Sequence, residues 1–274
     1  MKYLKVAVIQ PNVKVNEYQV NLEHATDMIR KCAEEGAKLV CLPEAFATSL
    51  NLPKVKELAQ TTNGEICTFL RDMAKECGVY LIGGFIEKEE DNIYSSAVCI
   101  NPEGTILGKY QRRYIYALEK HFLTAGKKSC LIETEIGKIG LIMGYDINFP
   151  EACRNLFKEG VEIIVSPTQI PKVYYQSTRQ LAIARATENN CYFILASSCG
   201  MNTIARLVYM GGSLVAHSST GLEDYSTQYS RQEDILESCE YDEGYFIAKL
   251  NMTKIRREIE DSTFFDDFMR NQGV

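Results

Sequence analysis

The residues around position 144 have the pattern of a turn that displays a reactive group. An apolar run over 139–143 stops at Gly144, and the sequence Phe-Pro-Glu follows at 149–151. Proline in the first turn of a helix, with an acidic residue beside it, is typical of a helix start, so 138–154 predicts a strand–turn–helix junction. Nucleophiles and ligands are found at such turns in α/β proteins. The residue at this tip, Gly144, has no side chain with which to attack a substrate.

Charged residues that could contribute to a site occur in two other segments. Glu44 stands just past the mostly apolar segment 38–43, where a carboxylate is equally well a site residue or a solvated loop charge. The polar, aromatic segment 111–120 carries four charged residues: Arg112, Arg113, Glu119 and Lys120. A guanidinium is planar and suited to holding a carboxylate with two hydrogen bonds. Arg112 therefore either binds a ligand or pairs with Glu44 or Glu119.

Apolar patterns along the chain predict alternating strands and helices. Strands are expected at 4–10, 38–44, 79–87, 94–100, 105–110, 130–135, 139–143, 161–165, 191–197, 207–217 and 245–250, and helices at 21–33, 66–77, 149–160, 176–189 and 254–260. The first 44 residues form a βαβ unit, and hairpins are expected at 94–110 and 130–143. This order predicts one α/β domain with mixed sheets over residues 1–274. The tail 261–274 contains Phe264, Phe265 and Phe268, so we expect it to pack on the body or on a second subunit.

Composition excludes several classes of function. The net charge of −6 and the pI near 5.3 argue against nucleic-acid and anionic-membrane partners. The longest apolar runs have the length of strands, well below the roughly 20 residues that cross a bilayer. The first ten residues are typical of a strand and lack the pattern of a signal peptide.

Cysteine usage indicates a reducing environment. The ten Cys fall within strand and helix patterns, and no C-x-x-C pair occurs. Buried, reduced thiols in a cytoplasmic protein explain this pattern better than disulfides or structural zinc. The three His are scattered, so no metal site is expected.

Seven ordered segments together resemble the nitrilase, or carbon–nitrogen hydrolase, family, and the resemblance runs nearly from end to end. They are Ala7–Gln10, Leu42–Glu44, Gly108–Arg112, Glu119–Gly126, Gly140–Glu151, Arg185–Asn190 and Gly212–Ser213. The resemblance implies a four-layer α-β-β-α sandwich that pairs as a homodimer or higher oligomer. It also implies cleavage of amides, nitriles or carbamoyl groups without metal or cofactor. In that chemistry a Cys attacks the carbon, a Glu acts as general base, a Lys stabilises negative charge and a second Glu supports the site.

The family's catalytic positions are only partly kept in this sequence. Glu44 falls on the general base and Glu119 on the supporting Glu. Arg112 falls on the Lys, with Arg113 as the alternative if the loop slips by one residue, and Gly144 falls on the Cys. Tyr145 and Arg113 are expected to contact a substrate. The base is therefore kept, the cation is changed in kind and the nucleophile is absent.

Three functions follow from this incomplete match. The first is a catalytically impaired homologue that keeps a pocket for a small amide- or carboxylate-bearing ligand. The second is an active hydrolase that uses water or another nucleophile, although Cys153 is expected to be buried in the helix after the turn. The third is a structural subunit that pairs with an active homologue. Whether any hydrolysis remains is left open by the sequence.

Overall fold

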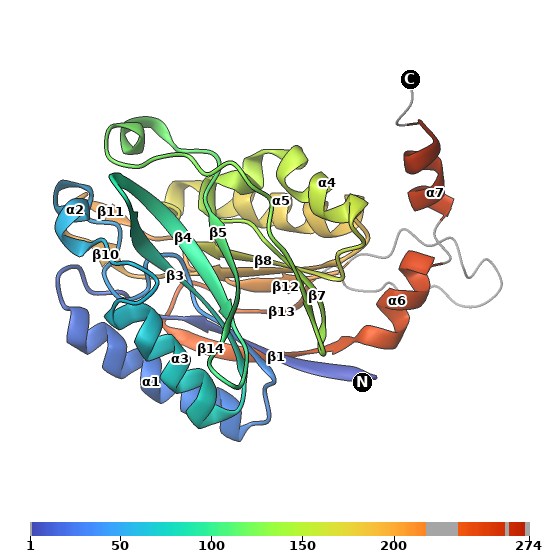
Figure 1. Cartoon of the computed structure of the whole chain (residues 1–274), viewed down its shortest axis with the longest axis horizontal. Coiled ribbons are helices and arrows are strands. Elements are labelled where there is room, and N and C mark those ends of the chain that lie inside the picture. Colours follow the sequence, from blue (N-terminus) through green and yellow to red (C-terminus); the bar gives the residue numbers. More distant parts are fainter. Residues whose placement is uncertain (1, 218–234, 261–262, 272–274) are drawn as a thin grey trace.

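The computed structural model describes residues 2–217, 235–260 and 263–271. Two six-stranded sheets lie face to face, and helices cover the outer face of each sheet (Figure 1). This arrangement confirms the predicted α-β-β-α sandwich. Within the described ranges, no helix is long and apolar enough to cross a membrane.

The first sheet contains the amino-terminal βαβ unit. Its strand order is β14 (Gly244–Asn251), β1 (Tyr3–Gln10), β2 (Leu39–Cys41), β3 (Tyr80–Glu89), β4 (Asn92–Ile100) and β5 (Ile106–Gln111). Strands β1, β2 and β3 are parallel, whereas β3, β4 and β5 are joined by antiparallel hairpins. Strand β14 pairs antiparallel with β1, so Tyr3 lies opposite Asn251.

The second sheet carries the predicted strand–turn–helix junction. Its strand order is β13 (Ile235–Ser238), β12 (Leu214–Ala216), β9 (Tyr192–Ser197), β8 (Ile163–Thr168), β7 (Gly137–Leu141) and β6 (Leu131–Thr134). Strands β7, β8 and β9 are parallel. A small separate sheet pairs β10 (Met201–Asn202) with β11 (Leu207–Val208).

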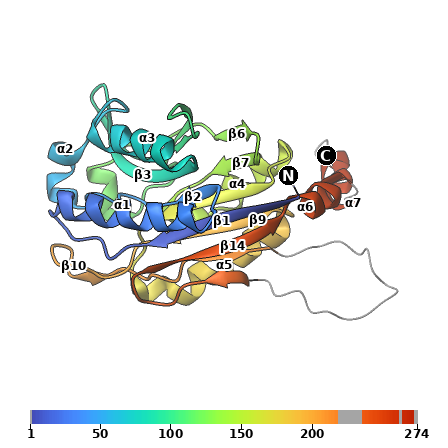
Figure 2. The ribbon, with the colours of Figure 1, turned by 90° about the horizontal axis from the view of Figure 1, so that it is seen from below.

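Amphipathic helices form the outer layers. Helices α1 (Tyr18–Glu34) and α3 (Glu65–Cys77) cover the first sheet, and α4 (Pro150–Lys158) and α5 (Tyr175–Glu188) cover the second (Figure 2). The remaining helices are α2 (Val55–Leu58), α6 (Met252–Glu260) and α7 (Thr263–Arg270). Ile66, Leu70 and Met73 of α3 recur at helical spacing and are all buried, which explains why this segment is a helix with one face on the sheet.

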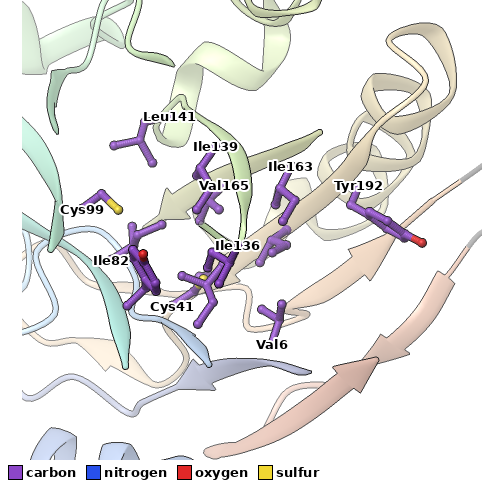
Figure 3. Packing of buried hydrophobic residues seen from close by; sticks show 14 of the residues in the cluster. Val6, Cys41, Ile82, Cys99, Ile136, Ile139, Leu141, Ile163, Val165 and Tyr192 are labelled. Carbon is purple, nitrogen blue, oxygen red and sulfur yellow. The ribbon is translucent and has the colours of Figure 1, made fainter. Parts of the chain in front are cut away.

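An apolar layer between the sheets holds the two halves together. Val6 and Ile82 of the first sheet face Ile139 and Val165 of the second, and all four side chains are fully buried (Figure 3). Each side chain of this size stabilises the fold by about 1.5–3 kcal/mol when it leaves water. The same layer fixes the distance between strand ends that belong to different sheets.

The structure departs from the sequence predictions at several element ends. The sequence predicted a strand over 139–143 with a helix soon after it. Instead, β7 ends at Leu141, and a 3-10 turn over Gly144–Asn148 separates it from α4. The strand expected at 207–217 is interrupted and becomes β11 and β12. In the tail, the Phe268 ring lies 5.4 Å from that of Phe157 on α4. The side chains of Phe264 and Phe265 and residues 261–262 and 272–274 lie outside the described part of the chain.

Candidate functional site

Glu44 lies just beyond the carboxyl end of β2 and is fully buried. Its Oε1 accepts a 2.5 Å hydrogen bond from the Ser95 hydroxyl, and its Oε2 accepts one of 3.2 Å from the Gln169 backbone N–H. The chain can pass this close to β3 because residue 84 is glycine: a Cβ on Gly84 would lie 2.6 Å from the Glu44 Cα. Glu44 is therefore a buried, hydrogen-bonded carboxylate and not a solvated loop charge.

Arg112 follows β5 and joins two carboxylates. Its Nη1 lies 3.1 Å from Glu44 Oε1, its Nη2 donates to Glu119 Oε2, and its side chain is only 3% exposed. Burial on its own would lower the pKa of Arg112, but the carboxylates of Glu44, Glu119 and Asp146 raise it above the ordinary value. Its Nε–H has no acceptor within the described part of the chain.

Glu119 lies in a 3-10 turn, Ala117–His121, inside the segment predicted as a loop. It also accepts a 3.3 Å hydrogen bond from the Tyr116 backbone N–H. Burial raises the pKa of Glu119, although the neighbouring Arg112 opposes that rise. With 14% of its side chain exposed, Glu119 is the more accessible of the two carboxylates that Arg112 bridges.

Gly144 occupies the tip of the turn in a left-handed conformation. Its φ is +45°, a value that side-chain-bearing residues rarely adopt. A Cβ on Gly144 would lie 2.7 Å from Glu44 Oε2 and 3.3 Å from Arg112 Nη1. The space beside Gly144 is thus taken by the two charged groups, and the structure brings Glu44, Arg112, Glu119 and Gly144 together as the sequence predicted.

Asp146 holds this turn in place, and the sequence argument did not select it. It accepts hydrogen bonds from the Tyr110 hydroxyl (2.7 Å) and from the backbone N–H groups of Tyr114 (2.8 Å) and Met143 (3.1 Å). Burial raises its pKa to about 6, against the lowering effect of these hydrogen bonds. The sequence did contain one signal for Asp146: an acidic residue close to the tip of the turn, between largely apolar neighbours.

A cavity of about 260 Å³ opens beside this cluster. It is lined by Arg112, Tyr116, Glu119, Tyr145, Asn148, Gln169, Ile170, Pro171, Tyr174, Ser177 and Thr178. Tyr145 contributes to the lining, and its contact with a substrate stays a prediction. Arg113 does not: it lies against the Tyr114 ring at 5.7 Å and lines a separate hollow.

Three tyrosines from different segments form the walls of the cavity. The ring of Tyr116 lies 5.0 Å from that of Tyr145 and 6.5 Å from that of Tyr174, in edge-to-face orientations. The hydroxyls of Tyr116 and Tyr174 are 3.1 Å apart. Tyr116, Tyr174 and Gln169 were not predicted, because only the folded chain brings the 3-10 turns at 117–121 and 172–174 to one cavity.

Other nucleophiles are poorly placed. Cys153 is fully buried within α4, and burial raises the pKa of its thiol to about 12. His24 and His121 are exposed, and His217 is buried beside Glu258, with 3.2 Å between Nε2 and Oε2.

No group of three or more His, Cys, Asp or Glu among the described residues is arranged to hold a metal ion.

Comparison with known proteins identifies the family. The sequence pattern of the carbon-nitrogen hydrolase family matches residues 5–221. The chain belongs to the carbon–nitrogen hydrolase family. A nitrilase of Pyrococcus abyssi is 35% identical over 218 residues, which cover 78% of this chain and 81% of that protein. A deaminated glutathione amidase of Mus musculus is 30% identical over 228 residues, covering 77% and 70% of the two chains.

A solved structure supports the fold of this carbon–nitrogen hydrolase family member. Saccharomyces cerevisiae Nit3, a member of branch 10 of the nitrilase superfamily, superposes with a TM-score of 0.84 over 96% of this chain and 95% of that chain. The two sequences are 24% identical, so this likeness concerns the fold alone.

Proposed function

We propose that this carbon–nitrogen hydrolase family protein is catalytically impaired and binds a small amide- or carboxylate-bearing ligand without cleaving it efficiently. In this proposal Glu44, Arg112 and Gly144 occupy the positions of the family's base, Lys and Cys, and Glu119 occupies that of the supporting Glu. Tyr145 contacts the ligand from the cavity wall. The ligand site is the 260 Å³ cavity that Arg112 and Glu119 line.

The proposal depends mainly on how Gly144 is surrounded. No side chain is present there to attack a carbon atom, and the Glu44 carboxylate lies 2.7 Å from where a Cβ would be. Arg112 Nη1 closes the other side at 3.3 Å. Covalent catalysis splits one difficult step into two easier ones, so a site without a nucleophile loses this advantage.

A water molecule activated by Glu44 is the rival mechanism. Oε1 of this carboxylate accepts a hydrogen bond from Ser95 and is paired with Arg112, and Oε2 accepts one hydrogen bond, from Gln169. Oε2 can still take a proton from water, but an attack by water lacks the advantage of a nucleophile held by the enzyme. We therefore expect slow turnover at most.

Of the two ligand groups, an amide suits the cavity better than a carboxylate. Arg112 already contacts Glu44 and Glu119, so its two terminal nitrogens are engaged by carboxylates of the protein itself. The amide of Asn148, in the lining, can hydrogen-bond a neutral partner, whereas the Gln169 amide already accepts from the Leu50 N–H and donates to Ser198.

Self-association and location also remain proposals. We propose that two copies pair near α4 and α5, and light scattering of the purified protein would test this.

All ten Cys are free thiols, which supports a reducing compartment such as the cytoplasm.

The deciding experiment combines ammonia release with calorimetric binding over a panel of amides, nitriles and carbamoyl compounds. It is run on the native protein, on Glu44→Ala as background, on Gly144→Cys and on Gly144→Cys combined with Arg112→Lys. We expect the native chain to bind an amide but to release no more ammonia than Glu44→Ala does. Ammonia release above that background is expected only from Gly144→Cys combined with Arg112→Lys. Ammonia release by the native chain above that background would overturn the impaired function and favour an active hydrolase.

A further inference from the structure

We propose that the cavity prefers a cationic ligand, an amide that also carries an ammonium group. This inference rests on the proposed binding function and names the ligand class for the same site. Two features carry it: an excess of buried carboxylates around Arg112, of which Glu119 reaches the cavity, and a wall of tyrosine rings.

The buried charges around Arg112 do not balance. Three carboxylates, those of Glu44, Glu119 and Asp146, act on this one guanidinium, and each raises its pKa. Among the described residues that line the cavity, Arg112 is the one cationic side chain. Buried charge is costly unless it is paired, so a second cation would stabilise this cluster.

The carboxylate that a ligand can reach is Glu119. It lines the cavity and is 14% exposed, whereas Glu44 is fully buried and absent from the lining. One Glu119 oxygen, Oε2, accepts from Arg112 and from the Tyr116 N–H. A ligand ammonium that pairs with Glu119 would add charge compensation, whereas a ligand carboxylate would meet a like charge and an Arg112 already engaged by two partners.

The tyrosine walls suit the same ligand. Tyr116, Tyr145 and Tyr174 line one cavity of about 260 Å³, with ring centres 5.0 Å and 6.5 Å apart. The face of an aromatic ring attracts a cation within about 6 Å of its centre. Three rings in one lining offer an ammonium more than one such partner, and apolar ligand carbons can pack on the same surfaces.

The test compares three amides of similar size that differ in charge. Isothermal titration calorimetry at pH 7 is run with 5-aminopentanamide (cationic), hexanamide (neutral) and 4-carbamoylbutanoate (anionic). We expect 5-aminopentanamide to bind about tenfold more tightly than hexanamide, and the anionic amide to bind most weakly. Glu119→Gln should remove most of the preference for the cation, whereas Glu133→Gln, an exposed carboxylate on β6, should leave it unchanged.

A second pair of variants separates ring attraction from hydrogen bonding. Tyr174 is 42% exposed, so its substitution leaves the core intact. Tyr174→Phe keeps the ring face and should keep the preference for the cation, whereas Tyr174→Leu should weaken cation binding about threefold to tenfold with a smaller effect on hexanamide.

The outcomes distinguish the two proposals. If hexanamide binds as tightly as 5-aminopentanamide, or more tightly, the cation preference is wrong and the proposed amide-binding function still stands. Tightest binding of 4-carbamoylbutanoate also overturns it. Binding of none of the three amides overturns the inference together with the proposed function.

Discussion

Glu44 Oε2 lies 2.7 Å from the position that a Cβ on Gly144 would occupy. The two residues come from different sheets and lie 100 positions apart in the sequence. A carboxylate fixed by hydrogen bonds from Ser95 and Gln169 thus takes the space next to the tip of the turn. Residue 144 and residue 44 are therefore coupled, and a side chain at the first requires a shift of the second.

Gly144→Ala tests this coupling directly. We expect a loss of about 1 kcal/mol from the left-handed backbone and about 1–3 kcal/mol more from crowding against Glu44. Urea denaturation of both proteins measures the change in the free energy of unfolding. Gly78→Ala is the matched control, because Gly78 has a φ of +61° and no atom within 4 Å of its Cβ position. If the free energy of unfolding falls equally in the two variants, Glu44 moves aside without a measurable free-energy cost, and the coupling is absent.

Arg112→Met should be strongly destabilising. It leaves Glu44 and Glu119 buried without their cation, and breaking a buried pair in this way costs about 3–5 kcal/mol. The loss should be smaller at pH 5 than at pH 7, because burial raises the pKa of Glu119 and its protonation removes an unpaired charge once Arg112 is gone. Chemical denaturation at both pH values measures it. Arg30→Met is the control, since Arg30 and Glu76 form an exposed pair and little change is expected. A loss as small as that of the control would contradict the bridging role of Arg112.

Asp146 should make stability depend on pH. Burial raises its pKa from 3.8 to about 6, so the folded chain holds a proton at pH values where the unfolded chain has released it. The contribution of this group to stability therefore falls as the pH rises from about 4 to about 6. The shift corresponds to about 3 kcal/mol. Relative to Asp146→Asn, which does not titrate, the native protein should gain about this much when the pH is lowered from 7 to 4.

Urea titrations of both proteins at four pH values between 4 and 7 follow this difference. Tyr110→Phe removes a hydrogen bond that lowers the pKa of Asp146, so the transition should move to higher pH in that variant. A difference between native protein and Asp146→Asn that does not change with pH would mean that Asp146 titrates normally.

The cysteines should differ in reactivity according to burial. Cys77 and Cys239 are partly exposed, whereas the other eight, Cys153 included, are buried. Because the thiolate is the reactive form and burial raises the pKa of Cys153 to about 12, iodoacetamide at pH 8 should modify Cys77 and Cys239 first. Peptide mass spectrometry gives the order of modification. Early modification of Cys153 would restore it as a candidate nucleophile.

Local patterns were sufficient to predict most of the strands and helices, whereas the four-layer sandwich was implied by the family resemblance. The helical spacing of Ile66, Leu70 and Met73 and the glycine that follows α3 gave a helix with the correct carboxyl end. A turn at Gly144 was expected, but β7 ends at Leu141 rather than Met143, and the 3-10 turn over Gly144–Asn148 was missed. That turn depends on hydrogen bonds that Asp146 accepts from Tyr110 and Tyr114, residues more than 30 positions away, which no local pattern contains.

The site residues were predicted from the family resemblance and were missed where the site depends on tertiary contact alone. Position at a strand end left Glu44 open between a site residue and a loop charge, and the resemblance grouped it with Arg112, Glu119 and Gly144. Gln169 contacts Glu44 through its backbone N–H, a group that every residue except proline has. Tyr174 is an exposed aromatic residue in a short turn, and nothing in its neighbours indicates that it meets Tyr116.

The pairing of β1 with β14 has a consequence for synthesis on the ribosome. Tyr3 lies opposite Asn251, so one side of β1 stays unpaired until β14, about 240 residues later, has been made. An unpaired strand edge is a template for pairing with other chains. The nascent chain therefore carries an open edge until β14 emerges, and shielding of that edge by a chaperone would favour correct closure of the first sheet.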